Sequence, residues 1–235
     1  MPNRYPAAEW VPWKWNENDP AFYYDGNTPE AVVLHVAEGW ATTIRTWARD
    51  GYSGASWHYT VCRDGQVLQH LDHNHGGYHA GIAPFRRDGT PNPQPTWKRW
   101  KGWGVNVNRY TIGVEHEGFT GTPMPSQQAA ASKALCKWLA AELGIPFERE
   151  RFPAHADIAL IDRANDFNSP QLREEHYAFL FAPDAPPPSV IDPTKVRMVP
   201  VGGAEVRTDV DWSDKPDERW VTVTTKQRMR LVVDP

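Results

Sequence analysis

The stretch Tyr110-Thr-Ile-Gly-Val-Glu-His-Glu-Gly118 begins as a short apolar run and becomes acidic at its end. Its apolar side chains alternate with other residues, which predicts a buried or half-buried strand. Glu115 and Glu117 lie two positions apart and therefore share one face of that strand, while His116 points to the other. Carboxylates at a strand end suit a site beside a cation or a reacting water, although a strand that simply ends in solvent carries similar residues.

Apolar runs on both sides of this strand predict the rest of a sheet. Residues 31–36 form a compact apolar run that contains a histidine near its end, which indicates a buried strand. Residues 57–62 and 67–71 predict a hairpin, because Asp64 and Gly65 between them supply the positive φ of a tight turn. Apolar residues at helical spacing predict helices at 40–50, 126–143 and 170–181.

Several connecting segments carry signals of their own. Ser126 is expected to cap the long helix, and Ser169 precedes a proline at the favoured first position of the last helix. Residues 72–109 form a connection so long that we expect it to be functional or specially packed. Residues 152–158 predict a short strand or loop that carries one histidine.

Composition divides the chain into four parts. Residues 1–29, rich in Trp, Pro, Asn and Asp, predict an irregular arm packed on the following domain. Residues 30–181 hold the predicted sheet and helices, and the proline-rich residues 182–188 predict a stiff linker. Residues 189–235 predict a small β-rich segment that is short for an independent core. Its strands are expected at 196–201, 219–224 and 229–233.

Charge, cysteine content and hydropathy argue against several classes of protein. With 25 basic and 29 acidic residues the net charge is −4, so no basic excess predicts nucleic acid as a partner. Cys62 and Cys136 form no CxxC pair and predict buried thiols in a reduced compartment. No run is long enough to span a membrane and the N-terminus lacks the apolar core of a signal peptide, so we expect synthesis in the cytoplasm and no membrane partner.

Four residues at the ends of these elements could form a metal site. His35 lies at the end of the first strand, Glu115 at the end of the central strand, and His155 and Asp166 follow the long helix. Two imidazoles and one carboxylate would give zinc three ligands and leave one position for a water, whose deprotonation zinc favours. A separate carboxylate can then act as general base and general acid. Each residue alone is weak evidence, because a histidine at a strand end is more often a hydrogen-bonded core residue than a ligand. The spacing is also not a compact motif such as HExxH.

The chain from about residue 30 to 181 resembles the type 2, zinc-dependent N-acetylmuramoyl-L-alanine amidases, which include phage lysins and peptidoglycan recognition proteins. The resemblance implies an α/β fold with a mixed central β-sheet flanked by helices and with the metal at one end of the sheet. The matching pieces, in order, are Val32-Val-Leu-His35, Ser56-Trp-His-Tyr-Thr-Val61 with Arg63-Asp-Gly65, Gly77-Tyr-His-Ala-Gly81, the central stretch quoted above, and Ala154-His-Ala-Asp-Ile158.

The resemblance also implies roles for individual residues. It makes His35 and His155 the histidine ligands of one zinc ion. Asp166 is our choice for the third ligand, Asp162 is its rival, and Asp157 is too close to His155 to be preferred.

Glu115 matches the acidic catalytic position of the family. Trp57 stands where some relatives carry a catalytic tyrosine, and Ala164 stands where many carry a lysine. Help for the oxyanion must therefore come from elsewhere, such as Arg163 or the zinc ion. Substrate contacts are expected from His79, Trp57, His58 and Trp40. No role is assigned to His70, His73 and His75, most of which we expect to be hydrogen-bonded loop or strand histidines.

The reaction implied by the resemblance is hydrolysis of the amide between the lactyl group of N-acetylmuramic acid and L-alanine of the stem peptide. We expect a monomeric phage-type endolysin that acts on peptidoglycan after release from the cell. Trp212 and Trp220 in the C-terminal segment are expected to pack partly on the domain, while another face helps to bind the wall. The alternatives are a cytoplasmic amidase that recycles muropeptides and a peptidoglycan-binding protein of the same fold without activity.

Overall fold

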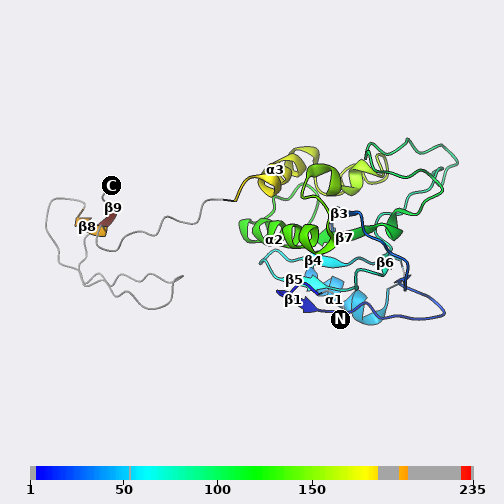
Figure 1. The fold of residues 1–235 in the computed structure, drawn as a ribbon, viewed down its shortest axis with the longest axis horizontal. Helices are drawn as coiled ribbons and strands as arrows, with labels where there is room; N and C mark the ends of the chain where they lie inside the picture. The colour runs from blue at the N-terminus through cyan, green and yellow to red at the C-terminus, as the bar shows by residue number, and fades with distance from the viewer. Residues whose placement is uncertain (1–3, 53, 185–195, 201–228, 234–235) are drawn as a thin grey trace. The chain divides into compact units, whose positions relative to one another are not determined.

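The computed structural model describes residues 4–52 and 54–184, together with the backbone of residues 196–200 and 229–233. The chain separates into two compact units, Met1–Ala182 and Pro183–Pro235. The first unit contains the sheet, the helices and all of the expected site residues (Figure 1).

The first unit is built on a five-stranded sheet. In chain order its strands are β1 (Ala8–Trp10), β3 (Ala31–Val36), β4 (Tyr59–Val61), β5 (Val67–Gln69) and β7 (Thr111–His116). They are arranged in the order β1-β5-β4-β7-β3 (Figure 1). β7 is parallel to both of its neighbours, β4 and β5 are antiparallel, and β1 is parallel to β5. The sheet is therefore mixed, as expected.

β7 is buried along its whole length and lies between β3 and β4. In its register with β3, Glu115 lies opposite His35, which brings two of the expected site residues together. Beyond both strands, an antiparallel bridge joins Gly39 and Gly118 through two backbone hydrogen bonds of 3.1 Å. The predicted central strand is confirmed, and its end lies at the site.

Three helices pack around the sheet: α1 (Ala41–Asp50), α2 (Ser126–Leu143) and α3 (Pro170–Phe181). α2 and α3 lie side by side (Figure 1) and share a core with the side chains of Leu34, Ile112 and Val114. α1 packs its buried Ile44 in a separate cluster that includes Trp13. Buried apolar stripes of the predicted helices therefore position the central strands.

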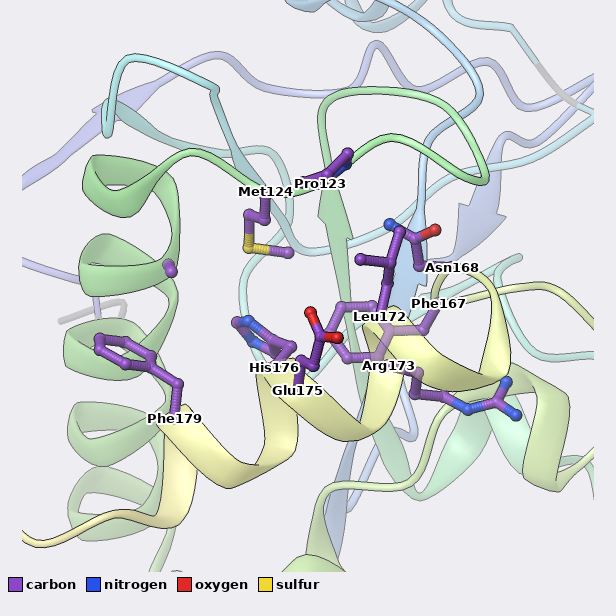
Figure 2. Close-up of a pocket in the computed structure, with 10 residues that line it drawn as sticks. Pro123, Met124, Phe167, Asn168, Leu172, Arg173, Glu175, His176 and Phe179 are labelled. Carbon is purple, nitrogen blue, oxygen red and sulfur yellow. The ribbon is translucent and has the colours of Figure 1, made fainter.

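A pocket of about 170 Å³ opens between α3 and the segment that precedes α2 (Figure 2). Its lining includes Met124, Phe167, Leu172 and His176. His176 is 7% exposed. Phe167, which lines this pocket, packs its ring against His176, and its backbone N–H donates a hydrogen bond to Oδ1 of Asp166.

The long connection between β5 and β7 is packed rather than free. It contains β6 (Gly76–Gly77), which pairs antiparallel with β2 (Phe22–Tyr23), and the short 3-10 helix Val107–Arg109. Trp97 is 5% exposed, stacks on Tyr110, and donates its indole N–H to the carbonyl of Glu150 at 2.8 Å. Burial of aromatic area on a long loop explains how so many residues remain ordered without regular structure.

Three local expectations need correction. The N-terminal arm is not wholly irregular, because β1 and β2 lie within it. Ser126 is the first residue of α2, and Pro125 occupies the cap position without a side-chain cap. Residues 152–158 contain neither a strand nor a simple loop but the 3-10 helix His155–Asp157. The strands of the arm form because β1 pairs with β5 and β2 pairs with β6, both distant in the chain.

In the second unit, β8 (Val196–Pro200) and β9 (Met229–Val233) form an antiparallel pair, with Val196 opposite Val233. Strands were expected in both places. The strand expected at 219–224 and the packing expected of Trp212 and Trp220 lie outside the described residues. Among the described residues no helix is long and apolar enough to cross a membrane.

Candidate metal centre and active site

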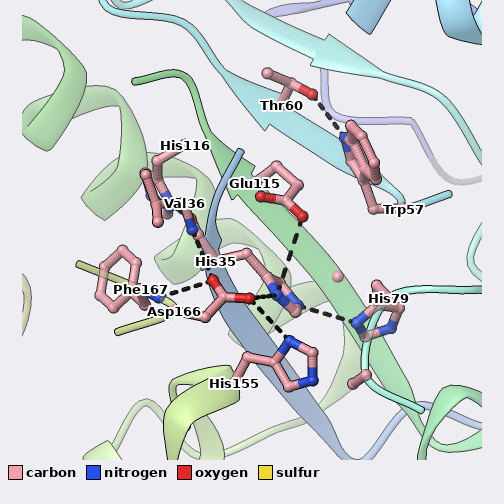
Figure 3. Close-up of polar contacts among 12 residues, drawn as sticks. His35, Val36, Trp57, Thr60, His79, Glu115, His116, His155, Asp166 and Phe167 are labelled. Carbon is pink, nitrogen blue, oxygen red and sulfur yellow. Dashed lines mark hydrogen bonds and ion pairs between the residues drawn. The ribbon is translucent and has the colours of Figure 1, made fainter. Parts of the chain in front are cut away.

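His35, His155 and Asp166 converge at one end of the sheet (Figure 3). One potential ligand atom from each lies within 4.8 Å of the other two. His35 comes from the end of β3, His155 begins the 3-10 helix after α2, and Asp166 lies in the turn before α3. Tertiary structure thus joins His35 to two residues that lie far from it in the chain, such as Asp166, 131 positions away.

The carboxylate of Asp166 is fixed by the backbone around it. Its Oδ1 accepts hydrogen bonds from the backbone N–H groups of Val36 at 3.0 Å and Phe167 at 2.8 Å. Its Oδ2 is thereby left to face Nδ1 of His155 at 2.9 Å and Nδ1 of His35 at 3.3 Å. Oδ1 of Asp166 is therefore held by the backbone, while Oδ2 faces the two histidines.

The backbone support of Oδ1 depends on an unusual turn. Phe167 and Asn168 have φ values of 59° and 69°, in the left-handed region that non-glycine residues seldom occupy. Each such residue costs about 1 kcal/mol or more, so the surrounding contacts must stabilise the turn. The Phe167 ring is 1% exposed and packs on His116, and the Asn168 side chain accepts a hydrogen bond from the backbone N–H of Gly121 at 2.8 Å.

The charges of the centre favour a cation. Burial opposes protonation of His35, but the charges of Glu115 and Asp166 outweigh burial and raise the pKa of this imidazole. Burial would raise the pKa of Asp166, yet the neighbouring His35 and His155 hold it well below its usual range. Burial lowers the pKa of His155 to about 4. The cluster therefore attracts a positive charge, which either a proton or a metal ion can supply.

The donor set fits zinc. Imidazole nitrogens and carboxylate oxygens are ordinary zinc ligands, and a tetrahedral site with bonds of about 2.0–2.2 Å places neighbouring ligand atoms roughly 3.3 Å apart. Here the two imidazole nitrogens lie 2.9 and 3.3 Å from the Asp166 oxygen. Three protein ligands in this arrangement are typical of a catalytic site with one open position.

Glu115 lies beside the cluster without belonging to it. Its Oε1 is 4.0 Å from Nδ1 of His35, and its Oε2 is buried with no hydrogen-bond partner among the described residues. Burial raises the pKa of Glu115 to about 7, the charge of Asp166 adds to the increase, and the charge of His35 opposes it. A carboxyl group with this pKa can both take and return a proton near neutral pH.

The other aspartates considered from the sequence lie elsewhere. Asp162 is exposed and forms an ion pair with Arg86 at 3.4 Å. Asp157 accepts a hydrogen bond from the backbone N–H of Ala154 at 2.9 Å and pairs with Arg149 at 3.2 Å. Of the three candidates, the structure brings Asp166 alone to the two histidines.

Three of the four residues expected to contact substrate are buried in the protein: Trp57, His58 and His79. Trp57 is 3% exposed, packs against Trp13, and donates its indole N–H to Thr60 Oγ1 at 2.8 Å. His58 is fully buried; its Nδ1 accepts from the backbone N–H of Gly113 and its Nε2 donates to the carbonyl of His75. Neither Trp57 nor His58 reaches solvent, because both complete the packing around β4.

Trp40, in contrast, is 51% exposed at the start of α1. Its ring packs edge-on against Phe119 at a centroid distance of 5.2 Å. The Gly39–Gly118 bridge holds the two residues together just beyond the strand ends that carry His35 and Glu115. Sequence reasoning missed Phe119, although its place directly after the acidic end of the central strand was a usable signal.

Glu117 does not join Glu115 at the centre. Its carboxylate accepts hydrogen bonds from the backbone N–H of Ala41 at 2.9 Å, at the start of α1, and of Arg63 at 2.8 Å, in the β4–β5 turn. The negative charge of Glu117 also interacts favourably with the N-terminus of α1. Glu117 therefore ties three segments together.

Among the histidines without an assigned role, two form the expected side-chain hydrogen bonds. His70 contacts Thr60 Oγ1 at 2.9 Å and the carbonyl of Val11 at 2.8 Å, and His73 contacts the Tyr59 hydroxyl at 2.7 Å. His75 instead packs on the rings of Phe22 and Tyr24, and its Nδ1 has no hydrogen-bond partner among the described residues.

Comparisons with known proteins identify the family. Residues 25–170 match the N-acetylmuramoyl-L-alanine amidase family, Amidase_2. N-acetylmuramoyl-L-alanine amidase A of Achromobacter lyticus is 25% identical over 130 residues, which are 52% of this chain and 60% of that protein. The match thus spans less than two thirds of the relative.

Solved structures show the same fold. A selenomethionine derivative of AmpD has a TM-score of 0.54 at 18% identity, covering 76% of this chain and 97% of that chain. A mutant of PlyL has a TM-score of 0.51 at 14% identity, covering 74% and 95% of the two chains. The expected mixed sheet with flanking helices is thereby confirmed. Because the matched region covers more than half of the chain and includes every residue of the centre, this protein belongs to the N-acetylmuramoyl-L-alanine amidase family.

Proposed function

We propose that this protein hydrolyses the amide bond between the lactyl group of N-acetylmuramic acid and L-alanine of a peptidoglycan stem peptide. The observation that carries the proposal is the convergence of His35, His155 and Asp166 beside Glu115 in a chain of the amidase family. A peptidoglycan-binding protein without activity would not need this complete set of ligands and catalytic carboxylate.

One zinc ion would be bound by Nδ1 of His35, Nδ1 of His155 and Oδ2 of Asp166. Zinc in such a site supplies Lewis-acid chemistry, which eases deprotonation of a water and polarises a carbonyl. The backbone anchor on Oδ1 of Asp166 keeps the other oxygen facing the two imidazoles. The protein therefore contributes a preorganised, buried set of three ligands.

Glu115 is the general base and then the general acid. Its unpartnered Oε2 is free to accept a proton from the attacking water, and the same proton can pass to the leaving nitrogen of L-alanine. The raised pKa makes the second transfer easier than it would be for an ordinary carboxylic acid. Its position opposite His35 in the sheet, with Oε1 4.0 Å from Nδ1 of His35, supports this role.

Two features around the centre support substrate binding. Arg163 is exposed, and its positive charge acts on His35, Glu115 and Asp166, so it is suited to stabilise negative charge that develops on the substrate. The Trp40–Phe119 pair presents an aromatic surface on which a sugar ring or a peptide can pack.

The test is direct product analysis. The full chain is incubated with soluble muropeptides, and mass spectrometry follows release of peptides with a free L-alanine amino group. We expect release that stops with a chelator and returns with Zn²⁺. Binding of muropeptides without release in the presence of Zn²⁺ would instead indicate the binding-protein alternative.

The biological role we propose is that of an endolysin whose residues 189–235 help to bind the wall. Rates on intact sacculi and on soluble muropeptides are compared for the full chain and a chain that ends at Ala185. We expect the shortened chain to keep its melting temperature and its rate on muropeptides but to lose sacculus binding. A preference of the full chain for soluble muropeptides would favour the recycling role. A large fall in melting temperature with unchanged binding would make the segment structural.

A further inference from the structure

His79 is a buried side chain that lies within hydrogen-bond distance of a proposed metal ligand, His35, without belonging to the ligand set (Figure 3). It follows β6 and is 8% exposed. Its ring lies over Gly113 of β7 so closely that a Cβ added there would be 2.6 Å from the His79 Cγ. The two ring nitrogens of His79 lie 3.1 Å from Nε2 of His35 and 3.3 Å from Oγ1 of Thr111.

The donor and acceptor of each of these hydrogen bonds can be assigned by starting from the Thr111 hydroxyl. The hydroxyl of Thr111 donates its hydrogen to the carbonyl of Val107 at 2.9 Å. Oγ1 of Thr111 can therefore only accept from His79, which places the His79 proton on Nε2. Nδ1 of a neutral His79 is then an acceptor, so the Nε2–H group of His35 donates a hydrogen bond to it.

This direction matters because it fixes the other nitrogen of His35. With its Nε2 protonated and donating, a neutral His35 carries its lone pair on Nδ1, the atom that faces Asp166 Oδ2. A nitrogen lone pair and a carboxylate oxygen that face each other at 3.3 Å repel, and a cation bound between them removes this repulsion. Histidine ligands of metal ions commonly depend on a partner at their second nitrogen for this purpose.

We propose that His79 is a positioning residue, which fixes His35 in the tautomer and ring orientation that direct its Nδ1 toward the metal centre. The inference rests on the zinc site of the proposed function. His155 has no comparable support, because its Nε2 is buried without a hydrogen-bond partner among the described residues. His35 is therefore the ligand whose geometry depends on a dedicated side chain.

The experiment measures zinc affinity rather than turnover alone. Full-length protein is stripped of metal, and the Kd for Zn²⁺ is measured by competition with a chromophoric chelator. We expect His79→Ala to weaken binding about 10- to 100-fold, the usual effect of removing such a partner. His79→Asn places an amide oxygen near the position of Nδ1 and is expected to restore part of the affinity.

His73 provides a matched control. It is also 8% exposed and hydrogen-bonded, but its ring contacts Tyr59 and Trp138 rather than the centre. His73→Asn is expected to change the melting temperature without changing the Kd for Zn²⁺. In the zinc-loaded protein, nitrogen NMR of the histidine side chains should find a proton on Nε2 of His35.

Three outcomes separate the possibilities. Equal affinity of wild type and a folded His79→Ala variant would overturn the positioning role, as would an equal loss in His73→Asn. A proton on Nδ1 of His35 in the zinc-loaded protein would contradict the tautomer. Failure of the wild type itself to bind Zn²⁺ would overturn the proposed metal centre instead, so the two failures are distinguishable.

Discussion

Buried histidines lie on both faces of the sheet beside β7, and the two groups are built differently. On one face, His35 and His155 direct Nδ1 toward a carboxylate at 3.3 and 2.9 Å. On the other face, His116 contacts the Ser132 hydroxyl at 2.8 Å, and the same hydroxyl lies 3.3 Å from Nε2 of His176. Both groups are buried to a similar degree, so burial does not distinguish them.

The difference is the presence of negative charge. Burial lowers the pKa of His116 to about 3 and that of His176 to about 4, and these rings are neutral members of a hydrogen-bonded core. At the candidate centre, carboxylates oppose the effect of burial and raise the pKa of His35, while burial still lowers the pKa of His155 to about 4. Convergence of imidazoles on a carboxylate, rather than histidine content or burial, therefore distinguishes the candidate metal centre from the group around Ser132.

The largest effect is expected from removing that carboxylate. Asp166→Ala should weaken Zn²⁺ binding by more than about 100-fold, because loss of a ligand exceeds loss of a supporting partner. Hydrolysis should fall with it. Asp162→Ala is the matched control, since Asp162 contacts Arg86 at the surface and should leave the Kd for Zn²⁺ unchanged. The opposite pattern in a metal titration would make Asp162 the third ligand.

The second prediction separates Zn²⁺ binding from catalysis at the candidate centre. Glu115→Gln should retain Zn²⁺ and the fold but lower kcat about 100-fold or more, as removal of a general base commonly does. Metal content and kcat are measured on the same preparation. A near-normal kcat would remove Glu115 from the mechanism.

Because His116 and His176 are buried and neutral, we expect the folded protein to lose stability in acid. The pKa of His176 is about 4 in the folded protein against about 6.5 when unfolded, so between these values the unfolded chain binds the extra proton. The free energy of unfolding should therefore fall as pH drops from about 6.5 toward 4. His176→Gln should reduce that slope by up to ~1.4 kcal/mol per pH unit, measured by urea unfolding. An unchanged slope would show that His176 does not stay neutral.

The smallest effect is expected at Glu117. Glu117→Gln keeps an oxygen that can accept one of the two backbone hydrogen bonds, so it should lower the free energy of unfolding by only about 1 kcal/mol. The rate should change by no more than a few-fold, because this side chain does not face the centre. A loss in kcat as large as that of Glu115→Gln would place Glu117 in the chemistry.

Sequence periodicity was sufficient for the strands and helices that carry the centre. The alternation around Glu115 predicted the central strand, and the apolar run before it predicted the strand of His35. Local rules were less successful at Ser126 and at residues 152–158, where the structure adopts a different cap and a 3-10 helix. These features depend on contacts with other segments rather than on the local pattern.

Trp57 and His58 show the limit of transferring positions from a resemblance. Their place in the chain suggested contact with substrate, but packing around Trp13 and hydrogen bonds to Thr60 and His75 bury them. Exposure of an aromatic side chain is decided by the segments that cover it. Those segments come from the N-terminal arm and the long connection, whose paths no local pattern specified.

The sequence by itself determined the strand order along the chain, the candidate residues and, through its motifs, the family. The tertiary structure decided which aspartate meets the histidines, because Asp166 faces His155 while Asp162 pairs with Arg86 at the surface. It also decided the place of His79, whose ring lies over a glycine of a distant strand. Both choices depend on contacts between segments remote in the chain, and side-chain period alone carries no information about such contacts.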